Sequence, residues 1–387
     1  MVPTTPTANL LACLVRINSV NPSLVPGGAG ESNIARFVKD WLGQRGIETG
    51  VHEAAPHRPS VIARVPGRGG GHSLLLNAHL DTVGVDGMSD PFNPRMEDGR
   101  MYGRGAYDMK AGLAACMLAL VDIRPGELAG DVLLAAVADE EHASLGIQDV
   151  LTRIRADAAI VTEPTSLQVC VAHKGFSWHE IVTSGRAAHG SQPHLGIDAI
   201  VHMGRVLNRL EILQSELRQR PPHRLLGHGS LHASLISGGQ ELSSYPATCT
   251  LQLERRTLPN EDTASVEQEI ERLLNTLAAE DPQFRASQRT TLVRPPFNVN
   301  EDAAIVQTLL REASVVLGQA PATFGASFWM DAAFLAAAGI PTVAFGPHGD
   351  GAHSIDEWGD LSSVDQCRAI LVRTIRSFSG KPSEPEA

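Results

Sequence analysis

Four short apolar segments limit the folds open to this chain more than any other feature of its sequence. They are almost uninterrupted by polar residues, which is typical of strands buried on both faces in a mainly parallel sheet. They occupy residues 73–78 (SLLLNA), 131–138 (DVLLAAVA), 158–162 (AAIVT) and 342–345 (TVAF). Helical patterns accompany them at residues 109–121, 301–317 and 332–338. This alternation predicts an α/β fold with a mainly parallel central sheet flanked by helices.

Residues that can bind a metal ion follow these strands at once or within a short loop, and Asp108 lies in the loop after Met101 and Tyr102, just before a helical pattern. Because functional sites in open α/β sheets lie beyond the carboxyl ends of the strands, we expect these side chains to meet at one edge. Imidazoles and carboxylates suit zinc or a similar divalent ion, and two ions about 3.5–4 Å apart need one bridging carboxylate. The sequence therefore predicts a two-metal site, for which the potential ligands are His79, Asp81, Asp108, Asp139, Glu140, Glu141, Glu163 and His353.

The middle of the chain has a different polarity pattern. Residues 176–184 and 247–254 partly alternate between polar and apolar side chains, which is typical of a sheet with one solvated face. Two helical patterns accompany these strands, within residues 199–210 and 266–277. At 387 residues the chain also exceeds the usual size of a single core. We predict a discontinuous catalytic domain, residues 1–173 and 293–387, interrupted by a smaller α+β domain at 174–292.

Charge and composition exclude several other classes of protein. The formal net charge is −11 and no long run of Lys or Arg occurs, which argues against a nucleic-acid-binding surface. No apolar run approaches about 18 residues and no secretory signal pattern is present, so we expect a cytoplasmic protein without a membrane segment. The five cysteines are scattered, which favours small buried side chains over disulfides or a cysteine metal site.

Five motifs occur in a fixed order along the chain. They are HLDTV (79–83), GRGAYDMKAG (103–112), DEE with TEP (139–141 and 162–164), GRAAHGSQPHLGIDAI (185–200) and GAHSIDE (351–357). In this order they resemble the motifs of the M20 metallopeptidase family, the zinc aminoacylases and carboxypeptidases. The resemblance covers nearly the whole chain. It implies a zinc-exopeptidase-like catalytic domain, an inserted lid domain that mediates dimerisation, and therefore a homodimer.

The resemblance also implies the ligands of two divalent ions. Zinc is the first expectation for these ions, and cobalt or manganese are the alternatives. His79, Asp108 and Glu163 would bind one ion. Asp108, Glu141 and His353 would bind the other, so that Asp108 bridges the two.

Two more residues of the same motifs would act beside the ions. Glu140 would be the general base, which takes a proton from water and later passes it to the leaving amine. Neighbouring residues at a strand end point in different directions, so Glu141 can bind a metal while Glu140 faces the water. Asp81 would hold the free ring nitrogen of His79 and thereby fix its tautomer.

Two residues of the inserted domain complete the implied site. In the family, a histidine at the position of His189 reaches the active site of the partner subunit and donates a hydrogen bond to the developing oxyanion. Arg256 lies in LERRTLP, which resembles a family D-x-R-x-x-P stretch with Glu254 in place of Asp, and would grip a substrate carboxylate. Arg255 would point to the other face. The alternatives are a surface histidine and a salt bridge at a strand end.

The expected reaction is hydrolysis of the amide bond of a small N-acyl amino acid, with acetylornithine or a close analogue as the preferred substrate. Residues 325–333 (GASFWMDAA) lack the arginine of desuccinylases, which argues against a succinyl diacid. Phe328 and Trp329 of this segment either line a substrate pocket or pack in the interior. A dipeptidase or carboxypeptidase with the same site is the main alternative. A non-catalytic, metabolite-binding relative is a weaker one, because Glu140 and every matched ligand are present.

Overall fold

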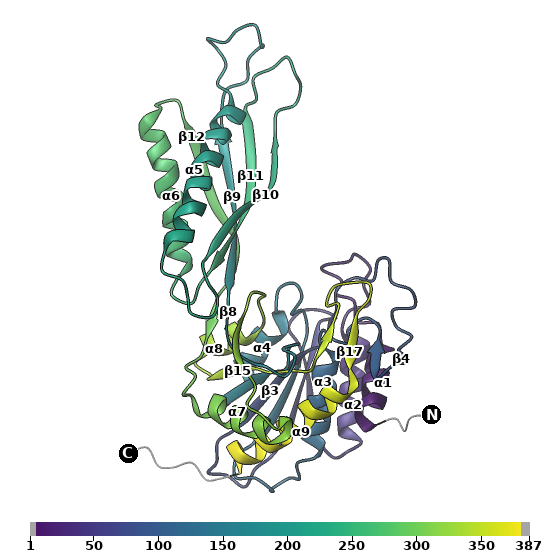
Figure 1. Cartoon of the computed structure of the whole chain (residues 1–387). Helices are drawn as coiled ribbons and strands as arrows, with labels where there is room; N and C mark the ends of the chain where they lie inside the picture. The colour runs from purple at the N-terminus through teal and green to yellow at the C-terminus, as the bar shows by residue number, and fades with distance from the viewer. Residues whose placement is uncertain (1–4, 381–387) are drawn as a thin grey trace. The chain divides into compact units, whose positions relative to one another are not determined.

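The computed structural model describes residues 5–380 and divides them into two compact units (Figure 1). The first unit contains residues up to 171, 299–324 and from 330 onward, and the second contains residues 172–298 and 325–329. The predicted insertion at 174–292 falls within the second unit. Residues 325–329 were expected in the first unit but pack with the second, where Trp329 Nε1 donates a hydrogen bond to the carbonyl oxygen of Pro295 at 2.9 Å.

A mixed sheet forms the centre of the first unit, in the strand order β1-β2-β6-β3-β7-β15-β8, with β14 paired to β8. Strands β6, β3, β7 and β15 run parallel, while β1, β2 and β8 pair antiparallel with their neighbours. The α/β class is therefore confirmed, and the sheet is mixed, with a parallel centre of four strands and antiparallel pairs on either side of it. The strands are β1 (Glu48–Glu53), β2 (Pro59–Val65), β3 (Leu74–His79), β6 (Val132–Val137), β7 (Ala158–Val161), β8 (Val169–His173), β14 (Thr323–Ala326) and β15 (Thr342–Ala344).

Helices flank this sheet, and α3 is the most deeply buried of them. Ala and Leu dominate α3 and favour a helix, and every residue from Lys110 to Leu120 is buried. A Cβ added at Gly112 would lie 2.1 Å from the carbonyl oxygen of Thr162, so glycine allows α3 to approach the segment that carries Glu163. The helices of this unit are α1 (Pro6–Val15), α2 (Ser32–Gly43), α3 (Lys110–Val121), α4 (Leu145–Arg153), α7 (Ala304–Leu317), α8 (Ala332–Ala337) and α9 (Leu361–Ser379).

A second, small antiparallel sheet of the first unit brings two distant loops together. Its order is β16-β17-β5-β4, with β4 (Arg95–Glu97), β5 (Arg100–Tyr102), β16 (Gly349–Asp350) and β17 (Trp358–Asp360). Met101 pairs with Gly359 in this sheet. The loop that follows β5 and the loop between β16 and β17 are therefore held side by side.

The second unit is an antiparallel sheet covered by two helices. Its strand order is β10-β11-β9-β12, and α5 and α6 pack on it around a core that includes Ile181, Met203, Leu251 and Ile270. The short β13 pairs with the end of β8. The elements are β9 (Gly175–Ser184), α5 (Ala199–Gln219), β10 (Ser230–Gly238), β11 (Thr248–Thr257), α6 (Thr263–Glu280), β12 (Arg285–Arg294) and β13 (Phe297–Asn298).

The predictions about the cysteines and about membrane-spanning helices can be compared with the structure of residues 5–380. All five cysteines are free, but Cys13 on α1 is exposed, so the prediction of burial is wrong for this residue and right for the other four. Cys13 lies on the solvent side of a helix whose opposite side carries the apolar Leu10, Leu11 and Leu14. Within this part of the chain, no helix has the length and hydrophobicity needed to cross a bilayer.

Candidate metal centre

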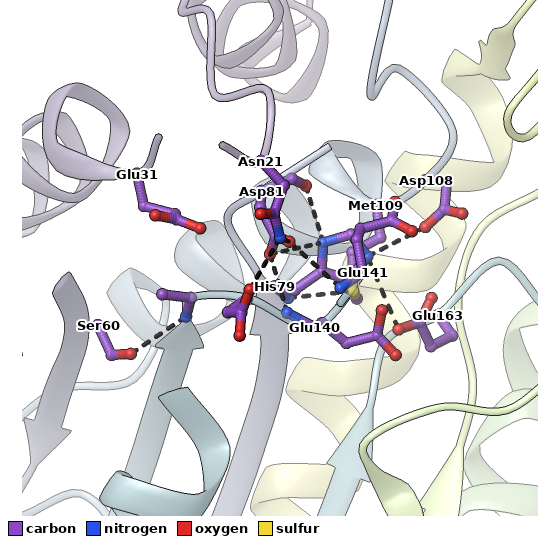
Figure 2. Close-up of polar contacts among 12 residues, drawn as sticks. Asn21, Glu31, Ser60, His79, Asp81, Asp108, Met109, Glu140, Glu141 and Glu163 are labelled. Carbon is purple, nitrogen blue, oxygen red and sulfur yellow. Dashed lines mark hydrogen bonds and ion pairs between the residues drawn. The ribbon is translucent and has the colours of Figure 1, made fainter. Parts of the chain in front are cut away.

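Five potential metal ligands of the first unit converge beyond the carboxyl ends of its parallel strands, and Figure 2 shows four of them, His79, Asp108, Glu141 and Glu163. His79 ends β3, and Glu141 and Glu163 follow β6 and β7 within a few residues. Asp108 lies in the loop between β5 and α3, and His353 lies in the loop between β16 and β17. The parallel strands supply three ligands directly, and the small sheet holds the two loops that supply the others.

The ligand atoms form two groups that share Asp108. His79 Nε2 lies 3.1 Å from Asp108 Oδ1 and 3.9 Å from Glu163 Oε1. His353 Nε2 lies 3.3 Å from Asp108 Oδ2 and 3.1 Å from Glu141 Oε2. Ligands about 2.0–2.1 Å from a tetrahedral ion are about 3.3 Å from one another. The spacing therefore suits two ions, with one Asp108 oxygen directed to each.

The chemistry of these donors also fits a pair of divalent ions. Each group combines one imidazole nitrogen with carboxylate oxygens, which is a donor set that zinc and similar ions accept. Glu141 Oε1 is buried and has no hydrogen-bond partner, which is costly unless a further group binds it. The residues thus form a candidate dinuclear metal site that could also be completed by water and substrate.

The carboxylates of the centre raise the pKa of both of its histidines when no ion is bound. Hydrogen bonds to Asp108 and Glu141 raise the pKa of His353 to about 10. Burial by itself would lower the pKa of His79, but the hydrogen bond to Asp108 and the charge of Glu163 raise it well above its usual value. Both imidazoles are therefore protonated near neutral pH when no metal is bound.

Metal binding is consequently expected to release protons. An imidazole binds a metal only when it is unprotonated, so affinity should rise with pH through the range below about 10, where His353 is charged. Calorimetry in buffers of different ionisation enthalpy should give release of about one proton or more for each ion at pH 7. His353→Asn should lower the total by about one proton. Equal heats in all buffers would contradict this picture of the site.

The tautomer of His79 is fixed by main-chain geometry. His79 Nδ1 lies 2.9 Å from the carbonyl oxygen of Asp81 and 3.7 Å from its carboxylate, so the carbonyl is the hydrogen-bond acceptor. In the neutral ring this hydrogen bond places the proton on Nδ1 and leaves Nε2 for a metal. The Asp81 carboxylate instead accepts the backbone N–H groups of Glu140 at 3.1 Å and Glu141 at 3.2 Å. Asp81 therefore orients two neighbouring segments of the centre at once.

A buried glutamate that the sequence analysis did not single out holds the Asp108 loop. Glu357 accepts backbone N–H groups from Gly105 at 2.9 Å, Tyr107 at 2.9 Å and Asp108 at 3.0 Å, and the Arg104 guanidinium at 2.7 Å. Burial raises the pKa of Glu357 despite these donors. Glu357 stands in the GAHSIDE motif, but no sequence pattern reveals that a side chain accepts from the backbone of a loop about 250 residues away.

Glu140 belongs to neither ligand group, although it directly precedes Glu141. Burial and the neighbouring charge of Glu163 raise its pKa well above the usual value. Figure 2 shows Glu140 on the same side of the centre as Glu163. A carboxyl group in this position can exchange a proton with a molecule bound at the ions.

Comparison with known proteins assigns the chain to a family. A sequence model of peptidase family M20/M25/M40 matches residues 75–377. The chain belongs to this family. It is 31% identical over 341 residues to acetylornithine deacetylase of Myxococcus xanthus, covering 85% of this chain and 86% of that protein. M20 enzymes hydrolyse amide bonds, and the chain is therefore an amidohydrolase.

Solved structures show the same M20 fold. A tripeptidase from Staphylococcus aureus aligns with a TM-score of 0.79 at 21% identity and covers 98% of this chain and 100% of that one. A dinuclear metal-binding M20 peptidase from Bacillus subtilis aligns with a TM-score of 0.72 at 17% identity and covers 97% of this chain and 98% of that one. At these identities the likeness establishes the fold alone.

The remaining predicted site residues of this M20 chain lie in the second unit. His189 is exposed, and its Nδ1 lies 2.7 Å from Ser191 Oγ. Arg256 on β11 donates from Nε to Glu254 at 2.6 Å, and its guanidinium lies 4.8 Å from the Phe176 ring centroid. Its neighbour Arg255 is fully buried on the opposite face, as the alternation of a strand requires. The roles of His189 and Arg256 stay predictions.

Phe328 and Trp329 differ in their surroundings. The Trp329 ring lies 6.0 Å from His173, and the Arg294 guanidinium lies 5.3 Å from its centroid. Trp329 therefore packs within the second unit. Phe328 is 42% exposed and remains free to contact a bound molecule.

Proposed function

We propose that this M20 enzyme uses two divalent ions to hydrolyse the amide bond of small N-acyl amino acids, with N-acetylornithine or a close analogue as its preferred substrate. The observation that carries the proposal is the pair of ligand groups that share Asp108, with Glu140 next to one of the ligands. The relatives named acetylornithine deacetylase support the choice of acyl amino acid.

The proposed chemistry needs two contributions, a water nucleophile and an acid for the leaving amine. Divalent ions bound in the two groups would lower the pKa of water and polarise the substrate carbonyl. Glu140 would take the proton as the water oxygen bonds to the carbonyl carbon. Glu140 would then donate this proton to the amine nitrogen as the C–N bond breaks. The raised pKa of Glu140 suits the second task, because a stronger base holds the proton until the amine leaves.

Two residues of the second unit have proposed roles in recognition. Arg256 would bind the carboxylate of the amino acid through its Nη atoms, since its Nε already donates a hydrogen bond to Glu254. His189 would donate a hydrogen bond to the oxyanion in the active site of a partner subunit. The second role requires a homodimer, which we propose together with zinc as the metal and the cytoplasm as the location.

A dipeptidase or carboxypeptidase is the second candidate function. The same ions, the same base and the same carboxylate-binding arginine would serve either an acyl or an aminoacyl group. The structural likeness to a tripeptidase favours keeping this candidate in the test.

A substrate panel distinguishes the two candidates. The metal-loaded protein would be assayed with N-acetylornithine, other N-acetyl amino acids, N-succinyl-diaminopimelate and simple dipeptides, with Glu140→Ala as the inactive control. We expect the acetylated amino acids to be hydrolysed fastest and the succinyl substrate to react poorly, because residues 325–333 lack an arginine. Cleavage of dipeptides alone would replace the first candidate with the second.

A further inference from the structure

A buried ionic cluster lies behind the metal ligands and touches none of their metal-binding atoms. Arg58, which directly precedes β2, is 6% exposed, and its partners Glu31 and Asp139 are completely buried. Arg58 Nε and Nη2 donate to the two oxygens of Glu31 at 2.8 and 2.7 Å, and Nη2 also donates to Asp139 Oδ1 at 2.6 Å. Burying three charges carries a large desolvation cost that apolar side chains would avoid. The cluster therefore calls for an explanation beyond stability.

Asp139 connects this cluster to the turn that carries Glu140 and Glu141. Its backbone is left-handed, with φ at +69°, a strained conformation that persists only where the surroundings hold it. Its Oδ2 accepts the backbone N–H of Ala143 at 3.2 Å, and its Oδ1 accepts from Arg58 and from Asn21. Both carboxylate oxygens are thus used, one on the turn itself and one on the cluster.

Asn21 extends the contact to the ligands. Its buried amide nitrogen donates to Asp139 Oδ1 at 3.0 Å and to Asp81 Oδ2 at 2.8 Å. Asp81 in turn accepts the backbone N–H groups of Glu140 and Glu141, as Figure 2 shows. An unbroken series of hydrogen bonds therefore runs from Arg58 through Asp139, Asn21 and Asp81 to both glutamates.

We propose that Arg58 is a positioning residue that fixes the direction of the Glu140 and Glu141 side chains. Its hydrogen bond to Asp139 fixes the turn, so that Glu141 is directed to the ion that it would bind together with His353, and Glu140 lies beside that ion. Without the guanidinium, the carboxylates of Glu31 and Asp139 remain buried without their cation, and the turn is released. The inference rests on the proposed function only for the role of Glu140, since its effect on metal binding is independent of any substrate.

The geometry of a guanidinium, rather than its charge alone, is required. Lysine would keep the positive charge but cannot donate to both Glu31 oxygens and to Asp139 in fixed directions. Arg58→Lys should therefore recover only part of what Arg58→Met loses. Arg64, six residues further along on β2, provides the matched control. It pairs with Asp131 at 2.7 Å through side chains that are 47% and 32% exposed and does not reach the turn.

The test measures metal binding without turnover and then kinetics. Affinity for Zn²⁺ would be measured by chelator competition, and Co²⁺-loaded protein would report ligand geometry through its visible absorption. Changes to groups that orient metal ligands typically cost about 10–100-fold in affinity or activity. We expect Arg58→Met to lose affinity by this factor for the Zn²⁺ ion that Glu141 and His353 would bind, and to alter the cobalt spectrum. Its kcat should fall by a similar factor, with KM changed less than about threefold. Arg64→Met should match the wild type in all of these.

Two results would overturn the proposal. One is a folded Arg58→Met protein with wild-type zinc affinity, cobalt spectrum and kcat. The other is an equal loss in Arg64→Met, which would indicate a general effect on β2. If Arg58→Met does not fold, Arg58→Lys and the charge-balanced pair Arg58→Met with Glu31→Gln give the same measurements. Failure of the proposed function would be seen separately, as a wild-type protein that binds two ions normally but hydrolyses no substrate.

Discussion

Glu140→Gln is expected to lower kcat by about 10²–10⁴-fold, the range typical of a removed general acid–base, while two ions remain bound. Glutamine has nearly the same size but cannot accept the proton of an attacking water or return it to the leaving amine. Glu140 stands outside both ligand groups, so its replacement leaves every metal ligand in place. Steady-state kinetics together with elemental analysis of the bound metal would measure both parts of the prediction.

Two companion variants sharpen the Glu140 prediction. Glu140→Asp retains a carboxylate on a shorter side chain and should recover part of kcat. Glu127→Gln makes the same chemical change at a glutamate that belongs to neither ligand group, and should leave kcat unchanged. If Glu140→Gln keeps more than about a tenth of the wild-type kcat, another group transfers the proton.

Asp108→Asn is expected to reduce the bound metal from two ions per chain to one. The two Asp108 oxygens face different histidines, at 3.1 Å from His79 Nε2 and 3.3 Å from His353 Nε2. Asparagine offers only one oxygen, so one ion loses its bridging ligand. A metal ion supplies several kcal/mol of transition-state stabilisation, which corresponds to a loss of roughly three orders of magnitude in kcat.

Metal stoichiometry is the decisive measurement for Asp108→Asn. Elemental analysis after equilibrium dialysis against Zn²⁺ would count the ions, and Asp302→Asn, the same change at an exposed aspartate of the first unit, would serve as the control. Retention of two tightly bound ions in Asp108→Asn would show that Asp108 is not the bridge.

The secondary structure of the first unit could be predicted closely because its signals are local. The apolar segments at 73–78, 131–138 and 158–162 correspond to β3, β6 and β7 within one or two residues. Ligands that end or follow parallel strands converge because those strands share one carboxyl edge. His79, Glu141 and Glu163 could be expected together for this reason. Asp108 and His353 could be named as potential ligands from their positions in loops, but their assignment to shared ions depended on the family resemblance, since the small sheet that holds their loops contains strands of only two or three residues.

Other features were hidden because they depend on contacts between distant segments. β10 is almost entirely exposed and β12 has a largely polar sequence, so neither shows a buried face that could mark it as a strand. The contacts of Glu357 with the Asp108 loop, and of Arg58 with Asp139, join residues more than 80 positions apart. The hydrogen bond between His79 Nδ1 and the main-chain carbonyl of Asp81 likewise depends on backbone geometry, which the identity of the side chains does not reveal.

The dependence of N-acetylornithine hydrolysis on the number of bound ions tests the central claim most directly. Metal-free protein would be loaded in steps with Zn²⁺, and the hydrolysis rate would be plotted against the ions bound per chain. Two groups that share Asp108 predict little activity without metal and a maximum at two ions. Full activity in the metal-free protein, or no hydrolysis of any acylated amino acid or dipeptide with two ions bound, would contradict the account.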